Sequence, residues 1–176
     1  MHREIVARSL DRALGVNEAP RRVLDVGCGT GVLLRLLAER LTGEGQELLG
    51  IDPAAGMVEE ANAQSNDPRI RVSLGTAEKL PYADGYFDVV ISTTSFDHWR
   101  DQAVGIRECY RVLAPGCFLI LTDVFSLFWA PSILFGRRGH ARTKRRASAL
   151  LNEAGFRAVT WHHLYRGIIA TAIAEK

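Results

Sequence analysis

The chain has 176 residues, of which 47% are hydrophobic and 24% are charged, and its formal net charge is +2. This length and composition are typical of one globular domain with a single sizeable core. A net charge this small gives no indication of a nucleic-acid partner. We therefore expect a single domain over residues 1–176.

Neither export nor a membrane span is predicted. The first ten residues carry charges and no apolar stretch of signal-peptide length. The apolar run 124–135 is interrupted by Ser126, Pro131 and Ser132 and is shorter than the roughly 20 residues that a span needs. The three cysteines form no CxxC pair, which argues against a disulfide framework or a structural zinc site. We expect a cytoplasmic protein without a bound metal.

Strands and helices alternate along most of the chain. A leading helix is predicted at 5–14, within residues 1–20, and Gly15 is suited to end it. Helices are then expected at 32–41, 54–63 and 103–113, and strands at 23–26, 47–51, 70–74, 87–91 and 117–121. The last of these strands follows a predicted turn at Pro115-Gly116.

The end of the chain has a different pattern. A helix at 147–154 precedes two strand-like runs, 156–162 and 167–174, whose short link permits only an antiparallel hairpin. The predicted fold class is therefore α/β. We expect a Rossmann-like, doubly wound and mostly parallel seven-stranded sheet with an antiparallel C-terminal hairpin and helices on both faces.

A glycine-rich loop, Asp25-Val26-Gly27-Cys28-Gly29-Thr30-Gly31, joins the first strand to the next helix. Its three alternate glycines allow a tight turn and a close approach to a ligand, and the helix N-terminus suits a carboxylate. A dinucleotide fingerprint needs its third glycine one residue later, where Val32 stands, so hydride transfer is disfavoured. Asp52, about 20 residues beyond the loop, can accept hydrogen bonds from both hydroxyls of a ribose.

Four further motifs follow the loop in order. They are Gly50-Ile51-Asp52 followed by Met57; Gly75-Thr76-Ala77-Glu78-Lys79-Leu80-Pro81-Tyr82; Phe87-Asp88-Val89-Val90; and Arg111-Val112-Leu113-Ala114-Pro115-Gly116. Over roughly 23–123 the ordered set resembles the class I S-adenosylmethionine (SAM)-dependent methyltransferases, in particular the small-molecule group that includes quinone-biosynthesis C-methyltransferases. The resemblance implies methyl transfer from SAM to a small-molecule acceptor by in-line displacement, with S-adenosylhomocysteine (SAH) as product.

The resemblance also implies roles for individual residues. Asp25 and the backbone around Gly27 would engage the methionine ammonium, Asp52 would bind the ribose, and Met57 would pack on the adenine. The backbone N–H of Ala77 would approach the adenine edge. The predicted cofactor site is completed by Cys28, Gly29, Gly31, Pro53, Thr76 and Glu78, and by Ser92 and Thr93 on the sulfonium side.

Several alternatives stay open at this point. Asp52 could cap a helix whose first residue is Pro53, and Met57 could be an ordinary core residue. Family members often have an Asp where Thr76 stands, and a hydroxyl carries no charge, so weaker adenine binding is expected. The alternative function is a SAM- or SAH-binding module without catalysis, acting as a sensor or partner subunit.

Asp97 and His98 are the candidate catalytic residues. They follow the strand at 87–91, at the carboxyl end where open α/β sheets bind their ligands. Either side chain could act as a general base for an oxygen or carbon nucleophile. A capping role for Asp97 and packing of His98 against Trp99 are the alternatives.

Residues 124–146 are predicted to form a lid insertion. The segment begins with several aromatic side chains, and 124–152 contains no acidic residue but six basic ones: Arg137, Arg138, Arg142, Lys144, Arg145 and Arg146. We expect the apolar half to cover an apolar or aromatic acceptor and the basic half to attract its negatively charged group. A solvated helix face with a homodimer contact is the alternative. Nucleic acid is disfavoured as acceptor, because no recognition module or Asn/Asp-Pro-Pro-Tyr motif is present.

Overall fold

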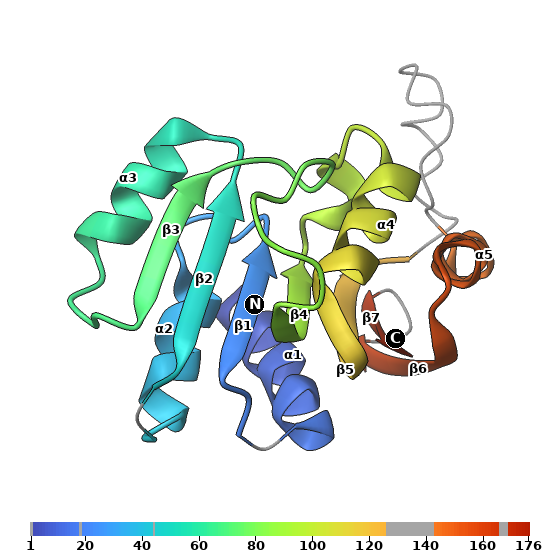
Figure 1. The fold of residues 1–176 in the computed structure, drawn as a ribbon, viewed down its shortest axis with the longest axis horizontal. Coiled ribbons are helices and arrows are strands. Elements are labelled where there is room, and N and C mark those ends of the chain that lie inside the picture. Colours follow the sequence, from blue (N-terminus) through green and yellow to red (C-terminus); the bar gives the residue numbers. More distant parts are fainter. Residues whose placement is uncertain (1, 18, 44, 126–142, 166–168) are drawn as a thin grey trace.

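The computed structural model describes residues 2–17, 19–43, 45–125, 143–165 and 169–176 (Figure 1). The elements, in chain order, are α1 (His2–Val16), β1 (Arg22–Val26), α2 (Val32–Arg40), β2 (Glu47–Asp52), α3 (Ala55–Ala63), β3 (Ile70–Leu74), β4 (Phe87–Thr93), the 3₁₀ helix η1 (Phe96–His98), α4 (Gln102–Val112), β5 (Leu113–Val124), α5 (Lys144–Ala154), β6 (Arg157–Tyr165) and β7 (Ile169–Glu175).

The strands form one seven-stranded sheet in the order β3-β2-β1-β4-β5-β7-β6. The first five strands in this order pair in parallel, whereas β7 is antiparallel to both β5 and β6. The predicted Rossmann-like α/β fold with its C-terminal hairpin is therefore confirmed. The chain leaves β1 towards β2 and β3 and returns on the other side to β4, so the topological switch point lies between β1 and β4.

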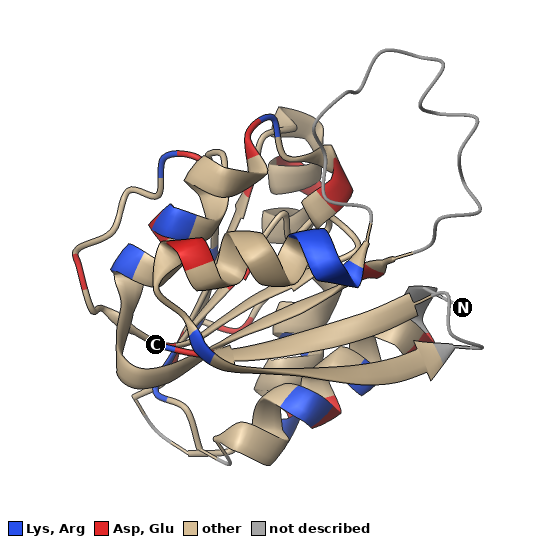
Figure 2. Ribbon diagram, turned by 90° about the vertical axis from the view of Figure 1, so that its right-hand side faces the viewer, with Lys and Arg blue, Asp and Glu red and all other residues tan. Residues whose placement is uncertain are grey.

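Helices cover both faces of the sheet. Figure 2 shows the sheet lying between the two layers of helices. On one face, Leu10 of α1, Leu34 of α2 and Val23 of β1 belong to one buried apolar cluster. On the other face, Ile106 of α4 packs in the cluster that contains Leu24 of β1. Because neighbouring strand residues point to opposite faces, a strand covered on both sides needs consecutive apolar residues.

Three features of the fold differ from the sequence-based expectation. Helix α5 begins at Lys144, before the predicted start at 147, so the last residues of the predicted lid 124–146 are helical. Strand β5 begins at Leu113, so Pro115-Gly116 lies inside the strand and not in a turn before it. The extra residues are absorbed by a register shift, since Leu113 pairs with Phe87 and Phe118 pairs with Val89. The 3₁₀ helix η1 was not predicted, because three residues are too few for a periodic pattern.

The predicted lid, 124–146, falls mostly outside the described residues. The structure places Val124 and Phe125 at the end of β5, and Thr143 caps the N-terminus of α5. None of the helices in the described part of the chain combines the length and the apolar content that crossing a membrane requires.

Candidate active site

A cavity of about 460 Å³ lies at the carboxyl ends of β1, β2 and β4, at the topological switch point. The glycine loop, the start of α3, the loop after β3 and the loop after β4 form its walls. Most of the predicted site residues line it, namely Asp25, Gly27, Cys28, Gly29, Asp52, Pro53, Met57, Thr76, Ala77, Glu78, Thr93 and His98. Motifs that are far apart in the sequence thus meet around one space.

Three predicted site residues do not line this cavity. Gly31 is the N-cap of α2 and has a positive φ of 74°. The fully buried side chain of Ser92 is hydrogen-bonded to Ser95 Oγ at 2.7 Å. Asp97 lies in η1, where its backbone N–H donates to Asp123 Oδ2 at 3.2 Å. Of the two candidate bases, the structure therefore brings only His98 to the cavity.

The backbone of the glycine loop explains why glycine occupies it. Gly27 has a φ of 75°, and its N–H donates to Ile51 O at 2.9 Å. A Cβ at Gly27 would lie only 2.5 Å from Ser95 Oγ. Gly29, with a φ of 53°, donates its N–H to Asp52 Oδ2 at 2.9 Å. The loop is thus fixed against β2 with bare backbone facing the cavity.

Asp52 is held in place by two loops at once. Its Oδ2 accepts the N–H of Gly29 and its Oδ1 accepts the N–H of Ala54, each at 2.9 Å. The alternative that Asp52 caps a helix beginning at Pro53 is wrong, because α3 begins at Ala55 and Ala54 is its N-cap. A carboxylate has about four acceptor positions, so two bonds leave Asp52 able to accept more from a ligand.

The cavity contains two buried carboxyl groups. Asp25 is 3% exposed and Asp52 is 9% exposed. Burial, and secondly the charge of Asp52, raises the pKa of Asp25 to about 7. Burial, together with both carboxylates, raises the pKa of the Cys28 thiol, which therefore stays protonated at neutral pH. Two acids in a desolvated space favour a positively charged ligand.

The cavity is lined by an apolar side chain, Met57, and by an acidic one, Glu78. Met57 lines the cavity and is 44% exposed, so a flat ring resting on it would remove apolar surface from water. Glu78 Oε1 accepts the backbone N–H groups of Arg100 and Asp101 at 2.7 and 3.1 Å. These bonds join the loop after β3 to the loop that precedes α4. The described residues contain no group of His, Cys, Asp and Glu side chains that could hold a metal ion.

The cavity is also lined by residues that were not predicted, among them Ser95, Trp99 and Val6. Ser95 and Trp99 lie in the loop after β4, which the sequence had marked as a ligand position without distinguishing these two. Ser95 Oγ donates to Val26 O at 2.8 Å and so ties this loop to the end of β1. Val6 reaches the cavity from α1 by tertiary packing alone, for which the sequence holds no signal.

Comparison with known proteins identifies the family. The family model described as "Methyltransferase domain" matches residues 24–121. The chain is 37% identical over 118 residues to a demethylmenaquinone methyltransferase of Thermus thermophilus, which covers 66% of this chain and 52% of that protein. The chain spans about half the length, or less, of the curated relatives that it matches. The match covers 52% of the Thermus thermophilus protein, and 44% and 37% of two further relatives.

Solved structures agree on the fold. A Haloferax volcanii methyltransferase in complex with the Trm112 methyltransferase activator has a TM-score of 0.84 at 18% identity, covering 99% of this chain and 89% of that one. The [4+2]-cyclase SpnF has a TM-score of 0.77 at 23% identity, covering 96% and 80%. The family match includes the glycine loop, Asp52 and the loops that enclose the cavity, and it covers more than half of the chain. This chain therefore belongs to the methyltransferase domain family, as its resemblance to the SAM-dependent methyltransferases predicts.

Proposed function

We propose that this chain binds SAM in the cavity and transfers its methyl group to a small-molecule acceptor. The observation that carries the proposal is the pair of buried carboxyl groups, Asp25 and Asp52, beside a bare glycine loop at the switch point of the sheet. SAM has an ammonium and a sulfonium charge, two ribose hydroxyls and a flat base. The residues present fit such a ligand in charge, in acceptor groups and in apolar surface.

The proposed binding roles follow from the contacts. The oxygens of Asp52, already oriented by Gly29 and Ala54, accept hydrogen bonds from the ribose hydroxyls. The ionised carboxylate of Asp25 pairs with the ammonium group of the ligand. This ion pair compensates the carboxylate for the hydration that it loses by burial. Met57 covers one face of the adenine, and the backbone of Ala77 approaches its edge.

SAM supplies an activated methyl group, so the protein chiefly positions the acceptor and excludes water. Thr93 and His98 line the cavity on the side that would face the acceptor, with Val6 of α1 adding apolar surface. We assign to His98 the role of accepting a proton from the acceptor's nucleophile. The similar demethylmenaquinone methyltransferase supports an aromatic acceptor.

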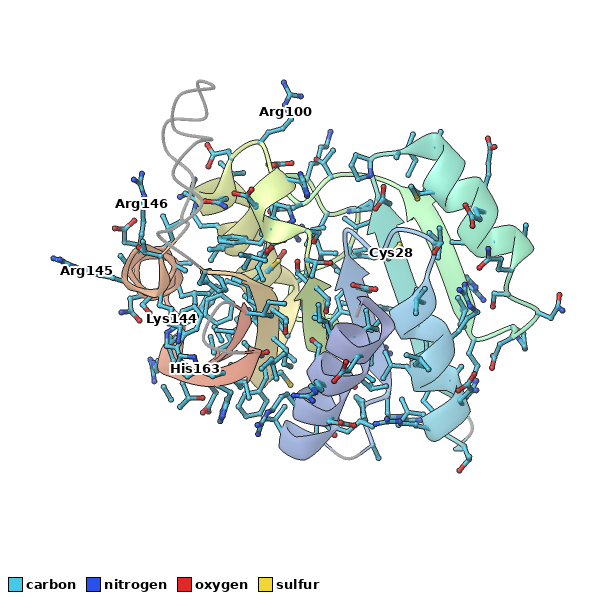
Figure 3. The ribbon with its side chains drawn as sticks, turned by 180° about the vertical axis from the view of Figure 1, so that it is seen from behind. Cys28, Arg100, Lys144, Arg145, Arg146 and His163 are labelled. Atoms are coloured by element: carbon cyan, nitrogen blue, oxygen red, sulfur yellow. The ribbon has the colours of Figure 1, made fainter. Side chains whose placement is uncertain are left out.

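Positive side chains support an acceptor with a negatively charged group. Lys144, Arg145 and Arg146 occupy the first turn of α5, and Figure 3, which looks along this helix, shows their side chains pointing outward around it, with His163 near Lys144. Strand β6 runs parallel to β5, since both are antiparallel to β7. The helix that connects them therefore begins at the carboxyl edge of the sheet, which is also the edge of the cavity.

Calorimetry tests the binding part of the proposal. Replacing Asp52→Ala removes a charged hydrogen-bond acceptor and is expected to weaken SAM and SAH binding by about 1.5–3 kcal/mol. Glu153→Gln, an exposed carboxylate in α5, is the control and should bind as the unchanged protein does. Equal affinities for a folded Asp52→Ala variant would remove Asp52 from the site.

Methyl transfer is tested with labelled SAM and a panel of aromatic acceptors with and without a carboxylate or phosphate. His98→Ala is expected to lower turnover while SAM affinity is kept. Tight SAM binding without transfer to any acceptor would support the non-catalytic binding module instead. If Lys144, Arg145 and Arg146 form a homodimer contact, replacing all three with Glu changes the mass in light scattering and leaves the acceptor's KM unchanged.

A further inference from the structure

The loop that follows β4 begins with an unusual backbone conformation at Thr94. Its φ is 56°, in the left-handed region, where a β-branched residue is a genuine outlier. Such conformations persist only where the surrounding structure enforces them, and they cluster at functional sites. Thr94 also lines the cavity. Its conformation therefore calls for a functional explanation.

Ala158 is the other non-glycine residue with a positive φ among the described residues, and its conformation has a local explanation. It lies in the edge strand β6, where the pairing with β7 shifts between Arg157 and Thr160. A bulge of this kind bends an edge strand and protects it from further pairing. The pairing of β4 with β5 is regular from Val89 to Thr93, so no bulge accounts for the conformation of the next residue, Thr94.

Two hydrogen bonds hold Thr94 in this conformation. Its N–H donates to Thr122 O of β5 at 2.8 Å, which continues the pairing of the two strands by one residue. Its hydroxyl donates to the carbonyl of the preceding residue, Thr93, at 2.7 Å. The strained residue is thus fixed to the end of the sheet, and the chain turns there.

The turn at Thr94 directs the next residues to two sides of the cavity. Ser95 packs against the glycine loop, since its Oγ donates to Val26 O at 2.8 Å and a Cβ on Gly27 would lie only 2.4 Å from its own Cβ. The carbonyl of Ser95 accepts the N–H of His98 at 2.9 Å, and His98 lines the cavity. The loop therefore joins the proposed cofactor-binding turn to the proposed base.

We propose that Thr94 is a positioning residue for methyl transfer, and that its left-handed backbone sets the spacing between the glycine loop and His98. This inference rests on the proposed function, since it requires SAM on the glycine loop and a proton-accepting His98. The glycine loop has its own anchors, because its N–H groups donate to Ile51 O and to Asp52 Oδ2. A change at Thr94 should therefore affect methyl transfer more than cofactor binding.

Substitutions at Thr94 separate the backbone conformation from the side chain. Asn and Gly enter the left-handed region readily, so Thr94→Asn and Thr94→Gly are expected to keep most of the turnover. Thr94→Val keeps the branched shape, loses the bond to Thr93 O and disfavours this region. We expect it to lower kcat about ten- to a hundredfold, as a small misplacement in an active site does, with SAH affinity nearly unchanged. Thr160→Val, at an exposed position of β6, is the matched control.

A double-variant cycle tests whether Thr94 acts through His98. Turnover is expressed per SAH-binding site measured by calorimetry, so unfolded protein does not contribute. In the His98→Ala background, Thr94→Val should cause little further loss. Independent losses whose factors multiply would overturn the inference. If Thr94→Val does not fold, Thr94→Ala replaces it, because its smaller side chain resists the left-handed region less, and a smaller loss with the same dependence on His98 is expected.

The outcomes separate this inference from the proposed function. If the unaltered protein binds neither SAM nor SAH, or transfers no methyl group, the proposed function fails and the role of Thr94 fails with it. If the unaltered protein is active and folded Thr94→Val is equally active, only the role of Thr94 fails. Equal losses in the Asn, Gly and Val variants would mean that the side chain matters and the backbone conformation does not, which also overturns the inference.

Discussion

Asp25 illustrates how a site for a cation is prepared at the level of one residue. Burial and the neighbouring Asp52 raise its pKa from 3.8 to about 7. Between these values the folded protein binds a proton that the unfolded chain has released. This contribution therefore makes the ligand-free protein less stable as the pH rises from about 4 to about 7. A cationic ligand needs the ionised form, so its affinity changes in the opposite direction.

We therefore expect SAM affinity to increase roughly tenfold between about pH 6 and about pH 8, as Asp25 changes from mostly protonated to mostly ionised. Near neutral pH, SAM binding should release a fraction of a proton. Calorimetry detects this release because the measured binding enthalpy then differs between buffers of unequal ionisation enthalpy. Asp25→Asn should bind more weakly and show no such pH dependence. A flat affinity profile for the unaltered protein would contradict the proton linkage.

At the scale of elements, the glycine loop depends on two distinct properties of glycine. Gly27 and Gly29 both have positive φ, but they differ in the space available for a side chain. A Cβ at Gly27 would collide with the side chain of Ser95. A Cβ at Gly29 meets nothing within 4 Å. Backbone strain in the left-handed region is about 1–2 kcal/mol for an L residue, and a steric clash adds to it.

The ligand-free Gly27→Ala variant is thus expected to be destabilised by more than Gly29→Ala, which should lose only about 1–2 kcal/mol. The free energy of unfolding in urea measures both. Ser95→Gly in the Gly27→Ala background removes the clashing atoms and should recover part of the loss. Equal destabilisation of the two alanine variants would mean that the Ser95 contact has no energetic weight.

Arg111 of α4 connects the helix to the loop that follows β3. Its guanidinium donates to Leu80 O at 3.0 Å and to Tyr82 O at 2.8 Å, and it pairs with Glu108 and Asp84. Lysine cannot reproduce this planar, multiply bonded arrangement. Because the side chain is partly exposed, we expect Arg111→Lys to reduce the free energy of unfolding by only about 1–2 kcal/mol.

The same variant should also weaken SAM binding modestly, since the Arg111-anchored loop carries Thr76 and Ala77 into the cavity. Arg40→Lys is the matched control, because Arg40 pairs only with the exposed Asp11 among the contacts that the structure describes. Urea unfolding and calorimetry report the two effects. Identical results for Arg111→Lys and Arg40→Lys would show that the loop holds its position without Arg111.

For the molecule as a whole, the sequence predicts the strand alternation, the hairpin and the ligand edge, because each follows from periodicity and link length. It does not predict which side chains meet across the core. Val6 comes from the first helix, and nothing in its local pattern shows that it reaches the cavity. The sequence singled out Asp97 and His98 together, yet the turn of η1 brings only one of them to the cavity.

The fold by itself leaves the chemistry open. The cyclase SpnF shares the architecture at a TM-score of 0.77, and function must be derived from the site and not from the fold. The family match places this chain in the methyltransferase domain family, and its cavity at the switch point contains two buried carboxyl groups, on which the proposed function rests. Catalytic assays are therefore informative only when they are combined with binding measurements on the site variants.

A chain of buried hydroxyl groups connects α1 to three strands across the centre of the molecule. Thr93 Oγ1 donates to Ser9 Oγ at 3.0 Å, Ser9 is bonded to Thr122 at 2.9 Å, and Thr122 is bonded to Thr171 at 2.8 Å. All four side chains are buried, and Thr93 lines the cavity. The position of α1 over the sheet is therefore coupled to the wall of the site.

Thr122→Val keeps the shape of the central residue but removes the hydroxyl that both Ser9 and Thr171 use. We expect a loss of about 1–3 kcal/mol in the free energy of unfolding and faster amide hydrogen exchange in α1. Thr160→Val, at an exposed position of β6, should change neither. If Ser9→Ala and Thr122→Val act through one network, the double variant loses less than the sum of the single losses. Strictly additive losses would mean that α1 is held by its apolar contacts alone, and that the hydroxyl chain does not couple it to the cavity.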